Sequence, residues 1–438
     1  MGAPTFHPGS HVSLYPLIIR QEDDEFIVGR VDMGTFASVP EVGVRALGYL
    51  RQGNSLAEIE ARLAAEDGST VDLQAFVADL MDLGFIAAVD ENPVLPSETA
   101  RNHLPWLKPD YVRWVFSRPI AVVYGVILTV AAVTIVRRPD LLPRTTDFFW
   151  SPLLSLVIAV NLLLGWLQVG SHELAHLVAA RAEGLPAHIR PGTRLQYLVL
   201  QTDVSGAWSL PRSGRYRIYL AGVLWELLVL SLLILVLAYG GLPSIGQALL
   251  GAWSLIIFFG LLGEFAFYMR TDIYFVFQDL LHSRNLFQDA QHLLAHRLGR
   301  AIYKLLPKPG VLPSDPLLAF APSDRRKVVF YACLLSAGTI ISLGRYVLIV
   351  IPILIQLISQ AAEGLVSGLR THNATGLIDG GFTLLALVGT QTLFVAAFFQ
   401  SHRRGLASAV ASVAKVLARH PPSHPDSAPS DAPPVPAP

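Results

Sequence analysis

The chain has little of what a soluble or a disulfide-stabilised protein needs. Its single cysteine, Cys333, has no second cysteine to pair with, which excludes an internal disulfide framework. Only 15% of its 438 residues are charged, against about 25% in an ordinary soluble domain, while 52% are hydrophobic. The mean hydropathy is +0.48. A water-soluble fold could not bury so much apolar surface, so the composition predicts a multi-pass membrane protein with soluble attachments.

The first 100 residues contain no lysine and are strongly acidic. They hold 5 arginines and 16 Asp or Glu, which gives a formal net charge of −11. The rest of the chain carries a net charge of +11. Residues 1–20 lack the basic segment and long apolar run of a secretory signal, so we expect the N-terminus to stay in the cytoplasm. The acidic balance argues against nucleic acid as a partner, because it would repel phosphates.

Residues 1–90 predict a small α/β domain of the winged-helix type. The expected strands are 14–20, 26–30 and 85–89, and the expected amphipathic helices are 41–52, 55–65 and 71–83. Ser55 and Glu58 form an S-x-x-E capping box at the start of the second helix. Gly53 and Gly84 stand where helices should end.

Beyond a linker at 91–116, rich in proline and polar residues, six apolar runs are long enough to cross a bilayer at about 20 residues per span. They are 117–136, 151–180, 216–239, 246–269, 328–358 and 376–400. These runs predict a helical transmembrane domain over 117–402 and a tail at 403–438, disordered from about 420, where 8 of the last 18 residues are proline. Basic residues concentrate in loops 181–215 and 270–327, so the positive-inside rule places both termini in the cytoplasm of a cell-membrane protein.

The run at 328–358 contains Arg345 near its middle. We expect one long tilted helix with Arg345 facing the bundle, because an arginine is costly in lipid. Two half-helices are the alternative, and they would change the number of later spans.

Residues 171–176 read Ser-His-Glu-Leu-Ala-His, at the end of a run with no other ionisable side chain. On a helix, His172 and His176 lie one turn apart and point the same way, as two zinc ligands must. Glu173 lies beside them, where it can accept a proton from an attacking water. Three ionisable groups near a bilayer are costly and need a compensating role. The alternative is two histidines that cap a helix at the membrane surface.

A catalytic zinc usually has three protein ligands and one open position. We expect Asp272 to be the third ligand. It follows the run 246–269, and the predicted topology brings that end to the same depth as the two histidines. Glu264 is the rival ligand, and Asp279 and His282 are weaker candidates. The alternative for Asp272 is a surface acid that follows a helix.

The His-Glu-Leu-Ala-His sequence in a span, with a later span ending in Asp, resembles the site-2 protease family of intramembrane zinc metalloproteases. Residues 220–226, Leu-Ala-Gly-Val-Leu-Trp-Glu, resemble that family's Ala-Gly-Pro…Asn segment, with Val223 in place of the proline and Glu226 at or near the amide. The resemblance covers residues 150–290.

Around the expected third ligand the family's Asp-Gly reads Asp272-Ile273. Tyr274 and Asn285-Leu286 are similar to the Asp-x-Tyr and Asn-Leu segments of bacterial peptide zinc metalloproteases. The resemblance implies hydrolysis of peptide bonds with one catalytic zinc ion. It implies His172, His176 and Asp272 as zinc ligands and Glu173 as the general base.

The N-terminal unit resembles the PqqD-type peptide-recognition domain of ribosomal-peptide modification systems. The resemblance rests on residues 45–50 (Arg-Ala-Leu-Gly-Tyr-Leu), 56–59 (Leu-Ala-Glu-Ile) and 80–86 (Leu-Met-Asp-Leu-Gly-Phe-Ile). It implies that residues 1–90 accept a leader peptide as an added strand.

These observations predict a membrane-embedded zinc endopeptidase that cleaves a peptide or membrane-protein substrate near the cytoplasmic face, with leader-peptide maturation or export as the expected setting. A hairpin is expected at 200–210, either as an open edge for an extended substrate or as a plain connection. Two other functions remain. One is regulated intramembrane proteolysis of a single-pass signalling protein. The other is a non-catalytic peptide-binding export partner.

Overall fold

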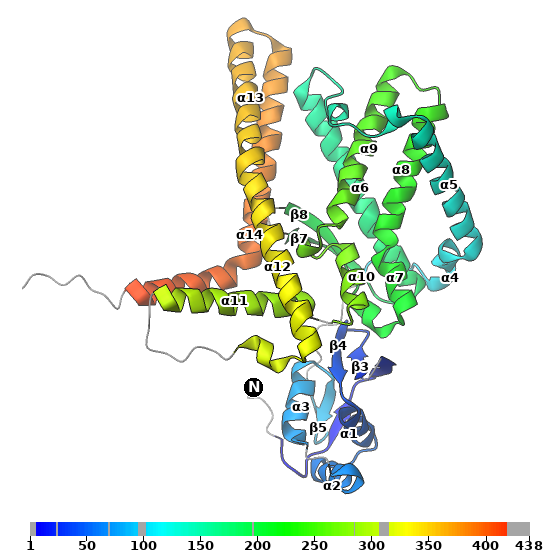
Figure 1. The fold of residues 1–438 in the computed structure, drawn as a ribbon, viewed down its shortest axis with the longest axis vertical. Helices are drawn as coiled ribbons and strands as arrows, with labels where there is room; N and C mark the ends of the chain where they lie inside the picture. The colour runs from blue at the N-terminus through cyan, green and yellow to red at the C-terminus, as the bar shows by residue number, and fades with distance from the viewer. Residues whose placement is uncertain are drawn as a thin grey trace, which may run out of the picture.

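The computed structural model describes residues 6–22, 25–68, 71–94, 102–194, 197–283, 285–305 and 315–417 (Figure 1). They form a mainly helical bundle with a small α/β domain at the N-terminus, as the composition predicts.

The N-terminal domain combines short antiparallel strands with three helices. The strands are β1 (Val12–Leu14), β2 (Ile18–Glu22), β3 (Glu25–Arg30), β4 (Thr35–Val39), β5 (Ile86–Val89) and β6 (Asn92–Pro93). The helices are α1 (Glu41–Arg51), α2 (Leu56–Asp67) and α3 (Leu73–Asp82). The strands pair in the orders β1-β5-β6 and β2-β3-β4. Apolar side chains from all three helices, including Leu47, Ile59 and Val77, are fully buried in one core.

Local sequence signals set the ends of these helices. The Ser55–Glu58 capping box is present at the start of α2. Gly53 and Gly84 follow helix ends with positive φ, of 80° and 74°, a conformation that favours glycine. The single strand expected at 14–20 is wrong. The chain is extended in β1 and again in β2, but between them Pro16 has no N–H to donate to a ladder.

Within the described part of the chain, six helices are long and apolar enough to cross a membrane, so the chain is a multi-pass membrane protein. They are α5 (Arg118–Arg137), α6 (Leu154–Ala182), α8 (Ala221–Tyr239), α9 (Ser244–Glu264), the continuous stretch Pro322–Thr371, and Ala374–Ala396 within α14 (Ala374–Leu417). Many of their large apolar side chains face outward, as lipid-facing residues do; Leu163 is 68% exposed.

The stretch Pro322–Thr371 consists of α12 (Pro322–Arg345), a π-helical turn (Tyr346–Val350) and α13 (Ile351–Thr371). It is one helix, as expected for 328–358, but at about 1.5 Å per residue it is more than twice as long as the bilayer core is thick. The expectation that Arg345 faces the bundle is wrong, because its side chain is exposed. In this part the helix packs mainly along α14, which leaves most of its circumference uncovered.

Shorter elements pack against the long helices. They are α4 (Pro109–Val112), β7 (His188–Arg194), β8 (Tyr197–Asp203), α7 (Arg212–Tyr219), α10 (Asp272–Leu280) and α11 (Leu286–Leu305). The hairpin expected at 200–210 is misplaced: β7 and β8 form it, and Ser205–Ser209 is a 3-10 turn.

Within the range expected to be a linker, residues 102–116 pack against the end of α6. Arg113 donates a hydrogen bond to the carbonyl of Ala182, and Arg181 donates to the carbonyls of Pro105 and Leu107. At the other end of the chain, the tail expected to be disordered from about 420 lies outside the described residues, and α14 continues to Leu417.

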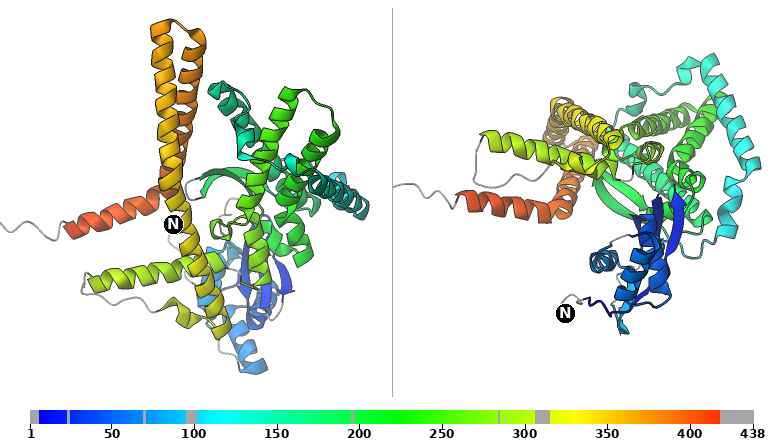
Figure 2. Two further views of the ribbon diagram at one scale, coloured as in Figure 1. Left: turned by 45° about the horizontal axis from the view of Figure 1, so that its top comes forward. Right: turned by 60° about the horizontal axis from the view of Figure 1, so that its bottom comes forward.

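The N-terminal domain, α7 and α10 lie at the same end of the bundle, and the α8–α9 and α13–α14 turns lie at the opposite end (Figure 1). Helix α11 runs across the direction of α12 in each view (Figures 1 and 2). The N-terminal domain contacts α7 and the 3-10 turn Ser205–Ser209 at this end.

Candidate metal centre

The last three turns of α6 carry polar side chains that are almost completely buried. The exposed fractions of His172, Glu173 and His176 are 7%, 8% and 5%. The helical spacing puts the two imidazole rings side by side, with their centroids 4.9 Å apart. A buried polar cluster in a membrane helix is costly unless its groups have partners, and those partners come from four other elements.

Asp272, at the start of α10, lies against both rings. Its Oδ2 is 2.7 Å from Nε2 of His176 and 2.9 Å from Nε2 of His172, and the two Nε2 atoms are 3.1 Å apart. The structure therefore brings together the three residues expected to bind zinc.

The three donor atoms lie close enough together to share one metal ion. Two ligands of a tetrahedral zinc ion, at bond lengths near 2.0–2.1 Å, lie about 3.3 Å apart. The separations of 2.7, 2.9 and 3.1 Å form a triangle only slightly smaller than one face of that tetrahedron. Two imidazoles and a carboxylate are a common donor set for catalytic zinc, and the fourth vertex would be left for a water or a substrate.

The second nitrogen of each ring faces an oxygen atom of another helix, but of the two only that of His176 makes a hydrogen bond to a described residue. Nδ1 of His176 donates to the carbonyl oxygen of Ile218, in α7, over 2.7 Å. Nδ1 of His172 lies 3.1 Å from Oε1 of Glu226, a buried residue of α8. In neutral rings that carry their protons on Nδ1, both Nε2 atoms are acceptors that face a carboxylate oxygen. Three acceptors directed at one point repel one another unless a cation lies between them, which favours a metal ion there.

Gly222, the second residue of α8, allows this close packing. A Cβ atom at this position would lie 2.3 Å from Nε2 of His172 and 2.5 Å from Nε2 of His176. Both distances are far shorter than van der Waals contact. The glycine of the Leu-Ala-Gly segment is therefore required by the two rings, for steric reasons.

The carboxylate of Glu173 is held beside the donors by β8. Its Oε2 accepts hydrogen bonds from the amide of Thr202, over 2.6 Å, and from the Thr202 hydroxyl, over 2.7 Å. Oε1 has no hydrogen-bond partner among the described residues and is left for water or substrate. No sequence signal points to Thr202, since it lies in a hairpin that the prediction misplaced. Glu226 had a signal, an acid inside an apolar span, but its contact with His172 was not predicted.

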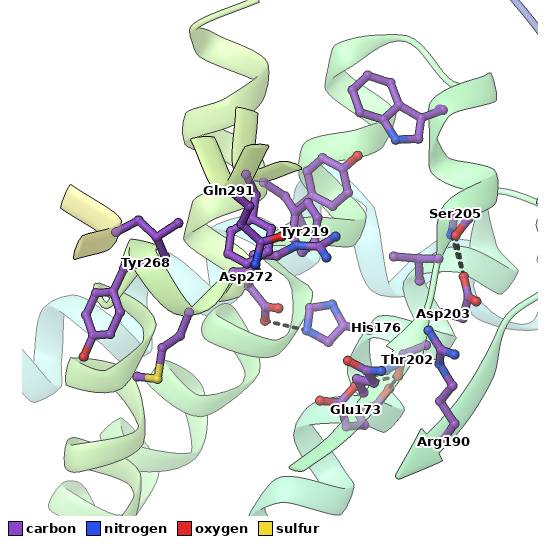
Figure 3. Close-up of a pocket in the computed structure, with 18 of the residues that line it drawn as sticks. Glu173, His176, Arg190, Thr202, Asp203, Ser205, Tyr219, Tyr268, Asp272 and Gln291 are labelled. Carbon is purple, nitrogen blue, oxygen red and sulfur yellow. Dashed lines mark hydrogen bonds and ion pairs between the residues drawn. The ribbon is translucent and has the colours of Figure 1, made fainter. Parts of the chain in front are cut away.

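A cavity of about 1000 Å³ opens beside these residues (Figure 3). Glu173, His176 and Asp272 lie on its wall, together with Thr202 and Arg190 of the hairpin. The far wall comes from α11 and α12 and includes Phe287, Gln291, Leu294, Leu335 and Thr339. Its volume is at the upper end of the range for small-molecule sites, large enough for a peptide segment of several residues.

The other candidates for the third ligand have different partners. Glu264 accepts a hydrogen bond from the backbone amide of Asp272 over 2.9 Å, so it fixes the start of α10. Asp279 pairs with Arg215 over 2.7 Å. His282 is exposed, and its Nδ1 bonds to the carbonyl oxygen of Leu280. None of the three belongs to the cluster of donor atoms found among the described residues.

Comparison of the chain with protein-family models, with curated proteins and with solved structures finds no match. The function is therefore argued from the geometry of the site.

Proposed function

We propose that the chain is a membrane-embedded zinc metalloendopeptidase that hydrolyses a peptide or membrane-protein substrate. The observation that carries this proposal is the convergence of His172, His176 and Asp272 on one point, with the Glu173 carboxylate beside them at a cavity wall. This combination of three donors and an adjacent base is the one expected for the site-2 protease family. The distribution of arginine and lysine supports a position near the cytoplasmic face of the cell membrane.

Each residue has a defined part in this proposal. The two Nε2 atoms and Oδ2 of Asp272 hold one zinc ion, which when bound polarises a carbonyl and makes a water more acidic. Oε1 of Glu173 takes the proton from the attacking water and then donates it to the amine of the leaving product. Thr202 holds the other carboxylate oxygen, so that the base keeps its orientation.

The surroundings of the site favour a peptide as substrate. The hairpin borders the cavity through Arg190, Gln201 and Thr202, and an extended chain could pair with its edge. The N-terminal domain lies at this end of the bundle and, if its resemblance to peptide-recognition domains holds, binds a leader peptide (Figure 1). Maturation or export of a leader-bearing peptide is the setting that fits both parts, with no role for nucleic acid.

The test compares the wild-type chain with Glu173→Gln, purified in detergent with zinc. Glutamine keeps an oxygen for Thr202 but cannot take a proton, so zinc content should be unchanged while cleavage of a peptide library falls by about 100-fold or more. Cleavage products are identified by mass spectrometry. Glu363→Gln, which changes an exposed acid of α13, is the matched control and should cleave like the wild type.

Equal cleavage by the wild type and Glu173→Gln contradicts the proposal. Zinc binding without cleavage of any peptide or membrane protein also contradicts it, and would favour the non-catalytic export partner. If a single-pass membrane protein is cut within its transmembrane helix while leader-bearing peptides are not, the enzyme is instead one of regulated intramembrane proteolysis.

A further inference from the structure

Arg215, in α7, is a completely buried arginine that joins three separate parts of the chain. Its exposed fraction is 0%. Nη1 donates to Oε2 of Glu22 over 2.9 Å and Nη2 donates to Oε1 of the same carboxylate, so this pair is bidentate. Nη2 also donates to Oδ1 of Asp279 over 2.7 Å. Glu22 ends β2 of the N-terminal domain and Asp279 lies in α10, so one guanidinium group connects the domain to the membrane bundle.

Neighbouring contacts support the same docking. Arg20 lies 2.6 Å from Glu22 and also donates to the carbonyl of Trp208 in the bundle, over 3.2 Å. Nε of Arg212 lies 3.5 Å from Oε1 of Glu22, and Arg215 lies 5.0 Å above the Trp208 ring. Burial raises the pKa of Glu22, but the hydrogen bonds and charge of Arg215 outweigh it and lower the pKa below its usual value.

Both helices that Arg215 joins hold part of the candidate metal centre. In α7, the carbonyl of Ile218, three residues after Arg215, accepts the hydrogen bond from Nδ1 of His176. In α10, Asp272 is the first residue and Asp279 lies two turns later on the same short helix. A shift of α7 relative to α10 would therefore change the distance between the imidazole of His176 and the carboxylate of Asp272.

We propose that Glu22, Arg215 and Asp279 are positioning residues for the metal centre, and that the docked N-terminal domain is a structural part of it. Glu22 neutralises one side of the Arg215 guanidinium, and this holds the other side against Asp279 and thereby fixes α10 relative to α7. The domain then does more than recruit a substrate. When the domain undocks, Arg215 loses its contact with Glu22, and the distances between the zinc donors are less well fixed. A partner that binds the docking surface of the domain would therefore control the metal centre.

This inference rests on the proposed function only in that the three donors bind zinc. Glu22→Gln in the full chain removes the charge but keeps the side-chain length. Since substitutions of residues that orient metal ligands usually weaken binding by 10- to 100-fold, we expect a zinc Kd about 10-fold higher, measured by competition with a chelator. The visible spectrum of the cobalt-substituted protein should also change, because it reports ligand geometry. Glu41→Gln, an exposed acid of the same domain, should bind zinc like the wild type.

A second variant separates docking from positioning. Asp279→Asn leaves the Glu22–Arg215 pair intact, so amide hydrogen exchange in β2 should stay slow while zinc binding weakens as in Glu22→Gln. If both variants bind zinc as tightly as the wild type and keep its cobalt spectrum, the inference is wrong although the metal centre stands. If the wild type itself binds no zinc, the proposed function fails first, so the two failures are distinguishable.

Discussion

Gly222 shows how closely single residues determine the candidate metal centre. A helical glycine normally costs about 1 kcal/mol relative to alanine, so the residue is unfavourable for α8 itself. It is required because the Nε2 atoms of His172 and His176 occupy the space of a side chain. The helix therefore loses intrinsic stability where the two imidazoles need room.

Gly222→Ala tests this steric requirement. We expect the added methyl group to displace the rings, because overpacking of this kind typically costs about 1–3 kcal/mol and moves side chains off their rotamers. The zinc Kd should rise by at least about 10-fold, measured by chelator competition. Gly165→Ala in α6, with no atom within 4 Å of the added carbon, is the control and should bind like the wild type. Equal zinc affinity in Gly222→Ala and the control would show that the rings have room to move.

Some single residues could be predicted from the sequence and others could not. The spacing of His172 and His176 puts both on one helix face, and the topology predicted from the arginine count brings Asp272 to the same depth. That they hold zinc stays a prediction. Thr202 and Glu226 could not be assigned, because their contacts depend on how a hairpin and a second helix pack against α6. Spacing within one element carries no information on such contacts.

Strand β2 and helix α7 meet through an ion pair whose pH dependence has a definite sign. The groups that face Glu22 are Arg20 on its own strand and Arg212 and Arg215 on α7, with Asp279 behind Arg215. The pKa of Glu22 is lower in the folded protein than its usual value of 4.5. Its contribution to stability is therefore present above that value and is lost as the pH falls through the lower, folded-state pKa.

We expect metal-free wild-type protein to have a higher unfolding midpoint than Glu22→Gln near pH 7. The difference should be constant down to about pH 5 and should shrink toward zero below about pH 4.5, as the wild-type carboxylate takes up a proton. Thermal unfolding in detergent, with zinc removed by a chelator, measures both midpoints. A difference that persists unchanged at pH 3, or that grows as the pH falls, would contradict the assignment of this stability to the ionised Glu22.

Element boundaries were predictable where a local signal exists. The Ser55 cap and the glycines after α1 and α3 mark helix ends in the sequence itself. The interruption at Pro16 and the strand β4 were not predicted. The pattern of apolar residues continues through positions where hydrogen-bonded pairing between strands stops, so the pattern alone does not locate strand ends. The helix Pro322–Thr371 is longer than the apolar run because it includes polar and charged residues on both sides of that run, where hydropathy gives no signal.

At the scale of the whole molecule, an apolar bundle and an acidic domain are joined at one end. The composition was enough to predict both parts and the membrane class. It could not predict how the parts dock. The chain has many charged residues, and composition does not show that Glu22 and Arg215 are the two that form a buried ion pair. The docked domain contacts the 3-10 turn Ser205–Ser209, and Ser205 and Trp208 of this turn also line the cavity beside the metal donors.

The most direct test of the central claim is the zinc stoichiometry of the full chain and of Asp272→Ala. We expect one zinc per chain in the wild type and well below one in Asp272→Ala, measured by elemental analysis after dialysis against a weak chelator. Asp110→Ala, which removes a carboxylate that is 86% exposed, should keep one zinc. A wild-type chain without zinc, or an Asp272→Ala chain that keeps as much as the wild type, would contradict the metal centre described above.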